Sequence, residues 1–192
     1  MVCVYCGCGE GRTRDHVPPK CLIRSPYPAD LLTVPACTDC NRDFSRDEEY
    51  FRLVIVGLLC HTAEADLLFD GSLSRSMNRN RGLEDRMLGS LEASGNQVLL
   101  DIEYPRVFRI AEKIARGLEF VESGTLYSLD QRFEVEFHEV EGGSRETEFG
   151  PDFTYCRCGP GGWEFTLFDS VRFNVRLAEP DAAVDGRKAG RH

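Results

Sequence analysis

Two pairs of cysteines near the amino terminus have the spacing of a zinc site. Cys3 and Cys6 form the first Cys-x2-Cys pair, and Cys37 and Cys40 form the second. Each such pair curls into a tight knuckle that presents two sulfurs to one tetrahedral ion, so the pattern predicts a structural Zn²⁺ held by four thiolates. Cys8 leaves open a second register, Cys6 with Cys8, but a single intervening residue rarely gives a knuckle, so we favour Cys3. The alternative to zinc is a set of ordinary buried thiols or disulfides.

An acid and an imidazole lie next to each other between the two cysteine pairs, at Asp15 and His16. Pro18 restricts Val17 to an extended conformation, which predicts that Asp15 and His16 end a strand. A carboxylate is a ligand for a hard divalent cation, and an imidazole can take a proton from water. The pair therefore predicts metal-dependent hydrolysis, against the alternatives of a solvated turn acid and a structural histidine.

The segments Cys-x2-Cys, Asp-His-x-Pro and Pro-x-Cys-x2-Cys-Asn together resemble the HNH endonucleases. These are the ββα-metal or His-Me finger nucleases, and the likeness is to the zinc-stapled branch that includes phage Holliday-junction resolvases. The resemblance covers about the first fifty residues. It implies that Asp15 and Asn41 are ligands of a catalytic Mg²⁺ or Mn²⁺ and that His16 is the general base. The implied substrate is DNA, with RNA not excluded, and the zinc is purely structural.

Three positions depart from the family pattern. The middle Asn of the family falls near Leu32 and Thr33, neither of which is Asn, and the common final His is replaced by Asn41, as in the resolvase-like branch. Phe44 stands where a lysine is common. An Asn after such a knuckle can also be a simple helix N-cap. These departures keep open an alternative function, a zinc-binding module that contacts nucleic acid or protein without cutting.

The whole chain is acidic, with a formal net charge of −9 over 192 residues. Such a balance repels phosphate unless basic residues are segregated. Three basic residues near the Asp-His pair, Arg12, Arg14 and Lys20, predict surroundings that attract phosphate. Four more arginines lie within residues 75–86, whereas acids concentrate in residues 134–152. A polar connector is the alternative interpretation of the arginine-rich stretch.

The composition bounds the class of protein. A hydrophobic content of 42% allows one good core, or a small motif plus one domain. No apolar run approaches ~18 residues, and no signal peptide is recognisable. Nine cysteines, an odd number, suit a reducing compartment. We therefore expect a cytoplasmic protein with no membrane partner.

Two segments have the pattern of helices. Residues 47–60 begin with acids and continue as a dense apolar run, which predicts a buried helix. In residues 105–122 apolar side chains recur at helical spacing, with a basic stripe on the neighbouring face. The stripe comprises Arg106, Arg109, Lys113 and Arg116. It can follow a phosphate backbone, although a solvated helix face is the common alternative.

Alternation of apolar and polar residues predicts antiparallel strands over residues 133–138, 163–167 and 171–177. The predicted fold class is α+β, with an N-terminal zinc-stapled ββα-metal motif over residues 1–60. A helical middle and an antiparallel C-terminal sheet occupy residues 61–178 and pack on the motif, with no role assigned by the sequence. Residues 179–192 are expected to form a disordered tail.

Overall fold

The computed structural model describes residues 1–79, 82, 85, 89, 91–94, 97–140 and 152–178. The predicted tail, residues 179–192, lies outside these residues, as does part of the arginine-rich stretch. In chain order the elements are β1 (Thr13–His16), the 3-10 turn η1 (Lys20–Leu22), β2 (Thr33–Ala36), α1 (Thr38–Val54), the π-helical turn η2 (Ile55–Leu59), α2 (Ala63–Leu68), the π-helical turn η3 (Phe69–Leu73), α3 (Ser74–Arg79), β3 (Leu91–Ser94), β4 (Gln97–Leu100), α5 (Tyr104–Ser123), β5 (Phe133–Glu139), β6 (Phe153–Arg157), β7 (Gly162–Leu167) and β8 (Val171–Leu177). The fold is mixed α+β with antiparallel sheets, which confirms the coarse fold class.

The chain begins with a short hairpin that leads directly into a helix. Strands β1 and β2 pair antiparallel, with Asp15 opposite Val34 and His16 opposite Thr33. Helix α1 follows at once, because Cys37 is extended and its sulfur accepts the Cys40 N–H as an N-cap. The expected strand end at Asp15-His16 is therefore present.

Helix α1 is longer than the apolar pattern of residues 47–60 predicts. Its first half, Thr38 to Arg46, is mostly polar and lies at the surface, so it has no apolar periodicity to detect. Its second half carries the predicted buried run, with Tyr50, Phe51 and Leu53 in the core. The helix then widens into the π-helical turn η2, which ends at Leu59 and is capped by Cys60.

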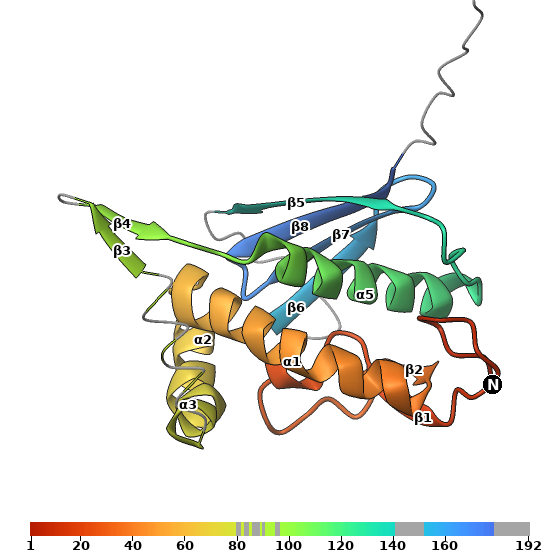
Figure 1. The fold of residues 1–192 in the computed structure, drawn as a ribbon, viewed down its shortest axis with the longest axis horizontal. Helices are drawn as coiled ribbons and strands as arrows, with labels where there is room; N and C mark the ends of the chain where they lie inside the picture. Colours follow the sequence, from red (N-terminus) through yellow and green to blue (C-terminus); the bar gives the residue numbers. More distant parts are fainter. Residues whose placement is uncertain are drawn as a thin grey trace, which may run out of the picture.

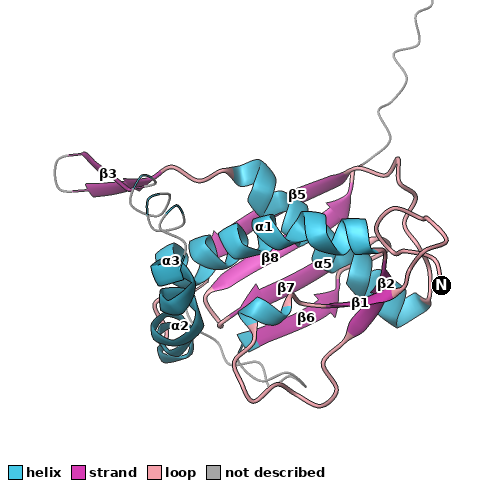
Figure 2. Cartoon of the chain, turned by 60° about the horizontal axis from the view of Figure 1, so that its bottom comes forward, coloured by secondary structure: helices cyan, strands magenta, loops and turns pink. Residues whose placement is uncertain are grey.

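Helix α5 and the strands at the end of the chain form the main layers. The sheet has the order β5-β8-β7-β6, and α5 lies along one face of it with α1 beside α5 (Figures 1 and 2). The predicted apolar stripe of α5 is buried, including Ile110, Ile114 and Leu118. Helix α1 reaches the same sheet, because the rings of Phe51 and Phe173 lie 5.5 Å apart. Residues of the N-terminal unit and of the C-terminal sheet thus share one hydrophobic core.

Strand β6 was not among the three strands predicted from alternation. It is five residues long, and apolar and polar residues alternate only over Phe153, Thr154 and Tyr155, so its pattern is shorter than those of the other three. The hairpin of β3 and β4 was also missed. Within the described part of the chain, no helix is long and apolar enough to cross a membrane.

Helix α5 approaches the Asp-His segment so closely that only glycine fits at the contact. A Cβ atom on Gly117 would lie 2.5 Å from Cγ2 of Val17, a buried and stiff β-branched side chain that follows His16 directly. A glycine within a helix normally costs about 1 kcal/mol relative to alanine. Replacing this glycine by alanine would therefore normally stabilise the helix, but at Gly117 the clash with Val17 opposes that stabilisation.

We predict that Gly117→Ala lowers the free energy of unfolding by about 1–3 kcal/mol, as overpacking of a core does. The matched control is Gly57→Ala, because a Cβ at Gly57 would meet its nearest neighbour, Leu53 Cδ1, at an ordinary 3.6 Å. Denaturant unfolding of both variants measures the difference. We expect Gly57→Ala not to destabilise the protein, because its Cβ meets no clash. If Gly117→Ala behaved like this control, the close approach of α5 to Val17 would be contradicted.

Candidate metal centre and acid-base site

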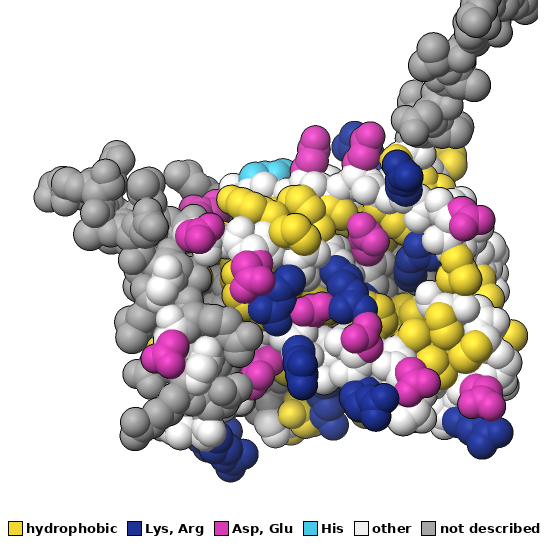
Figure 3. Space-filling model, viewed as in Figure 1, with side chains coloured by type: hydrophobic (Ala, Val, Ile, Leu, Met, Phe, Trp, Pro, Cys, Tyr) yellow, Lys and Arg dark blue, Asp and Glu magenta, His cyan; other side chains and the backbone are white. Residues whose placement is uncertain are grey.

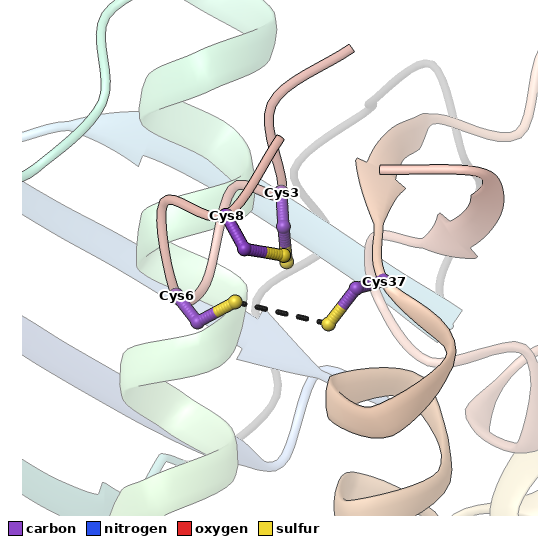
Figure 4. Close-up of side chains that lie close together, drawn as sticks. All are labelled: Cys3, Cys6, Cys8 and Cys37. Carbon is purple, nitrogen blue, oxygen red and sulfur yellow. Dashed lines mark hydrogen bonds between the residues drawn. The ribbon is translucent and has the colours of Figure 1, made fainter. Parts of the chain in front are cut away.

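Four thiols converge at the start of α1. The sulfurs of Cys3, Cys6, Cys8 and Cys37 all lie within 4.8 Å of one another and point toward a common centre (Figure 4). The Cys6 and Cys37 sulfurs are 3.7 Å apart. Tetrahedral Zn–S bonds of about 2.3 Å place sulfurs about 3.8 Å from each other, so this group could hold a metal ion such as zinc.

The membership of this thiol group differs from the expectation in one residue. Cys8, the alternative that the spacing disfavoured, belongs to the group, whereas Cys40 does not. The physical reason is a tight turn. Gly7 has a positive φ of 69° and donates its N–H to the Cys3 carbonyl, and the Cys3 N–H in turn donates to the Cys8 carbonyl at 2.8 Å. The chain therefore folds back after Cys6 and returns the Cys8 sulfur to the centre.

Cys37 and Cys40 contribute unequally to this centre. The Cys40 backbone N–H donates to the Cys37 sulfur at 3.4 Å and lowers the pKa of the Cys37 thiol to about 6. A thiolate at neutral pH is the form that binds metal. Burial, and then the neighbouring Cys37 and Cys6 thiols, raise the pKa of the Cys40 thiol. Cys40 thus lies beside the centre, with its backbone activating a ligand.

Asp15 is buried and paired with a lysine. Its side chain lies 2.8 Å, Oδ2 to Nζ, from Lys113 of α5, and its Oδ1 accepts the His16 N–H at 2.9 Å. Lys113 also forms an ion pair with Glu48 of α1. The side chain of Lys113 is 1% exposed and that of Asp15 is 7% exposed. Oδ2 has this ammonium as its neighbour but no well-directed hydrogen bond.

His16 has the protonation state that a general base needs. It ends β1 opposite Thr33 and is half-buried. Burial is the main cause that lowers the pKa of the His16 imidazole, and the Lys20 ammonium lowers it further, against the opposing effect of Asp15. Because the pKa of His16 lies below its usual value of about 6.5, the imidazole is neutral at pH 7.

Asn41 lies in the first turn of α1 and reaches the hairpin. Its side-chain amide donates to Thr13 Oγ1 at 3.4 Å. Thr13 and Asp15 are two residues apart on β1, so their side chains project to the same face of the strand. The N-cap of α1 is Cys37, which excludes the alternative that Asn41 caps the helix. Strand β1 and helix α1 thus bring the amide of Asn41 to the face of the hairpin that carries Asp15.

The basic stripe of α5 is occupied by acids of α1. Arg106 and Arg109 both pair with Asp47, at 2.7 and 2.6 Å, and Arg109 also pairs with Asp43. On this face of the molecule dark-blue and magenta side chains are intermixed (Figure 3). The expectation that this stripe follows a phosphate backbone needs correction for Lys113, because a lysine enclosed between two carboxylates cannot reach a ligand at the surface.

The remaining predicted basic residues differ in their exposure. Arg116 donates to two backbone carbonyls of the loop before β5. Arg12, Arg14 and Lys20 are exposed near the hairpin, where Arg14 donates to Thr33 Oγ1 at 3.0 Å. Of the whole predicted set, these three keep their side chains at the surface beside the Asp-His pair.

The partners of Asp15 were not predicted from the sequence. Glu48 was seen only as a helix-start acid, and Lys113 only as part of the basic stripe. A signal was present for Lys113, because it precedes Ile114 and follows Ile110 by three positions, within the apolar face of α5. A lysine at such a position requires a buried counter-charge.

The protein is expected to bind about one zinc per chain, measured by native mass spectrometry. Cys37→Ser should abolish this binding and unfold the N-terminal unit, since structural zinc supplies much of the folding free energy of such segments. Cys8→Ser should reduce zinc occupancy more than Cys40→Ser, because the Cys8 sulfur lies within the group of four. The opposite order of the last two variants would assign the fourth ligand to Cys40.

Comparison with known proteins supplies no family for this arrangement. No protein-family model matches the chain, and the curated proteins and solved structures that were searched contain no significant match. The function must therefore be inferred from the chemistry of the site itself.

Proposed function

We propose that this protein is a metal-dependent endonuclease of the HNH type, which hydrolyses phosphodiester bonds in DNA. The observation that supports this most is one unit of two strands and a helix. Strand β1 ends on Asp15-His16, helix α1 begins at the thiol group, and Asn41 extends from its first turn to β1. This is the order of elements to which the name ββα-metal refers.

In this proposal His16 takes a proton from the attacking water. Its imidazole is neutral at pH 7, which is the form that can accept a proton. Asp15 fixes the end of the strand by accepting the His16 backbone N–H. Attack by that water on phosphorus, with departure of the 3′ oxygen, would leave 5′-phosphate and 3′-hydroxyl ends.

Asp15 and Asn41 would hold a catalytic Mg²⁺ or Mn²⁺. A carboxylate and an amide oxygen are hard donors of the kind these ions prefer, and Mg²⁺ commonly uses only one or two carboxylates of the protein. When bound, such an ion neutralises the negative charge that develops on the phosphoryl group. The thiol group takes no part in the reaction, since a zinc with four thiolates has no open position.

One observation favours a second function, a zinc-binding module that contacts nucleic acid or protein without cutting. Lys113 already provides Asp15 with a positive charge at 2.8 Å. A divalent cation at Asp15 must therefore compete with a buried ammonium. If the ammonium is not displaced, the acid serves only to hold α5 against the hairpin.

The cleavage test uses supercoiled plasmid with Mg²⁺ or Mn²⁺ and compares wild type with His16→Ala. We expect nicking or linearisation by wild type and a loss of about 10²–10⁴-fold in rate for the variant, the usual contribution of a general base. The matched control is His138→Ala, because His138 is an exposed residue of β5. Each protein must retain its zinc.

Equal cleavage by wild type and His16→Ala would rule out His16 as the base and point to a contaminating nuclease. If wild type is inert on plasmid, branched and single-stranded DNA, the catalytic proposal fails. Retention of DNA binding by an inert protein would then support the module that does not cut.

A further inference from the structure

A cavity of about 660 Å³ lies beside the segment that follows His16. Its volume is within the range of about 300–1,000 Å³ that is usual for ligand sites. Three separate parts of the chain contribute basic side chains to its wall. They are Lys20 and Arg24 from η1 and the loop after it, Arg52 from α1, and Arg75 from α3. Among the described residues that line the cavity, none is acidic.

The four cations are held in different ways. Arg24 is neutralised by Asp152, with Nε and Oδ1 2.7 Å apart. Arg52 is buried in the wall, and its Nη2 donates to Ser76 Oγ at 2.8 Å, which fixes the guanidinium. Lys20 and Arg75 are exposed, and the described part of the structure records no carboxylate paired with either of them.

These cations contrast with the basic stripe of α5. In that stripe, Arg106 and Arg109 form ion pairs with acids of α1, which neutralise their positive charge. In a chain with a net charge of −9, a cavity whose basic side chains exceed its acids marks a local positive potential. Such a site selects an anion, and phosphate is the anion that several guanidinium and ammonium groups from different directions fit well.

The cavity begins on the segment that follows the proposed general base. Lys20, which lines the cavity, lies four positions after His16 in the chain. Its ammonium lies 4.2 Å from the centre of the Tyr27 ring, which holds it at the cavity wall.

We propose that this Lys20–Arg75 cavity binds backbone phosphates of DNA next to the bond that is cut. The proposal rests on the endonuclease function proposed above and names the surface that receives the substrate. It assigns substrate binding to η1, α1 and α3 instead of the basic stripe of α5.

The test is the affinity of wild type and variants for a fluorescent DNA duplex, measured by anisotropy with Ca²⁺ and without chelator. Each phosphate contact contributes a slope of about 0.9 in log K against log salt, so losing one contact weakens binding about eightfold at about 0.1 M salt. We expect this loss for Lys20→Gln and for Arg75→Gln, with a salt slope lower by about 0.9.

The matched control is Arg132→Gln, because Arg132 is an exposed residue outside the cavity lining. We expect its affinity to stay within about twofold of wild type. Lys20→Arg keeps the charge and should bind like wild type. All variants must retain their zinc and their melting temperature, so that a loss of binding is not a loss of fold.

Failure of this inference differs from failure of the proposed function. If wild type does not bind DNA, or Lys20→Gln and Arg75→Gln bind as Arg132→Gln does, the cavity is not the DNA site, even where plasmid cleavage depends on His16. If both cavity variants bind weakly while no protein cuts DNA, the cavity stands as the DNA site of a module that does not cut.

Discussion

The buried ammonium of Lys113 joins the parts of this fold on which the site depends. It comes from α5 and contacts Asp15 of β1 and Glu48 of α1, so one charge joins three elements that are distant in sequence. Removing a lysine and a carboxylate from water costs several kcal/mol per ion, and only close pairing offsets that cost. The hairpin, α1 and α5 must therefore meet at this point, and Gly117 allows α5 to come close enough.

The thiol group fixes the other end of the same unit. A segment of about sixty residues is too short to build a stable core alone, and a bound metal compensates for that in small domains. The group joins the N-terminal loop to the first turn of α1, while Lys113 joins β1 to α5. Asp15 belongs to the second of these centres, and His16 follows it directly in β1. The thiol group and the Lys113 ion pairs, which are both largely buried, thus position Asp15 and His16.

Much of the fold was predictable because periodicity reports burial. The α5 helix and the strands β7 and β8 were found within a residue or so at each boundary. Helix α5 and β8 have a buried face and an exposed one, and β7, although buried on both faces, still alternates apolar and polar residues in its sequence. The first half of α1 is polar and has no apolar periodicity, and β6 alternates over only three of its five residues, so these two segments give little pattern to detect. The position of the Cys8 sulfur depends on a turn, which spacing along the chain does not encode. The position of Lys113 within the apolar face of α5 indicates its burial, but its partners Asp15 and Glu48 come from tertiary contacts that the spacing does not identify.

Anomalous diffraction from crystals soaked in Mn²⁺, recorded at wavelengths that separate manganese from zinc, can locate the two metals separately. We expect a zinc signal at the thiol group and a separate manganese signal at Asp15 and Asn41, with the Lys113 ammonium moved away from Asp15. A zinc signal alone, with Lys113 still paired to Asp15, would contradict a catalytic cation at this site. The hairpin and helix would then be a structural unit of a protein that binds without cutting.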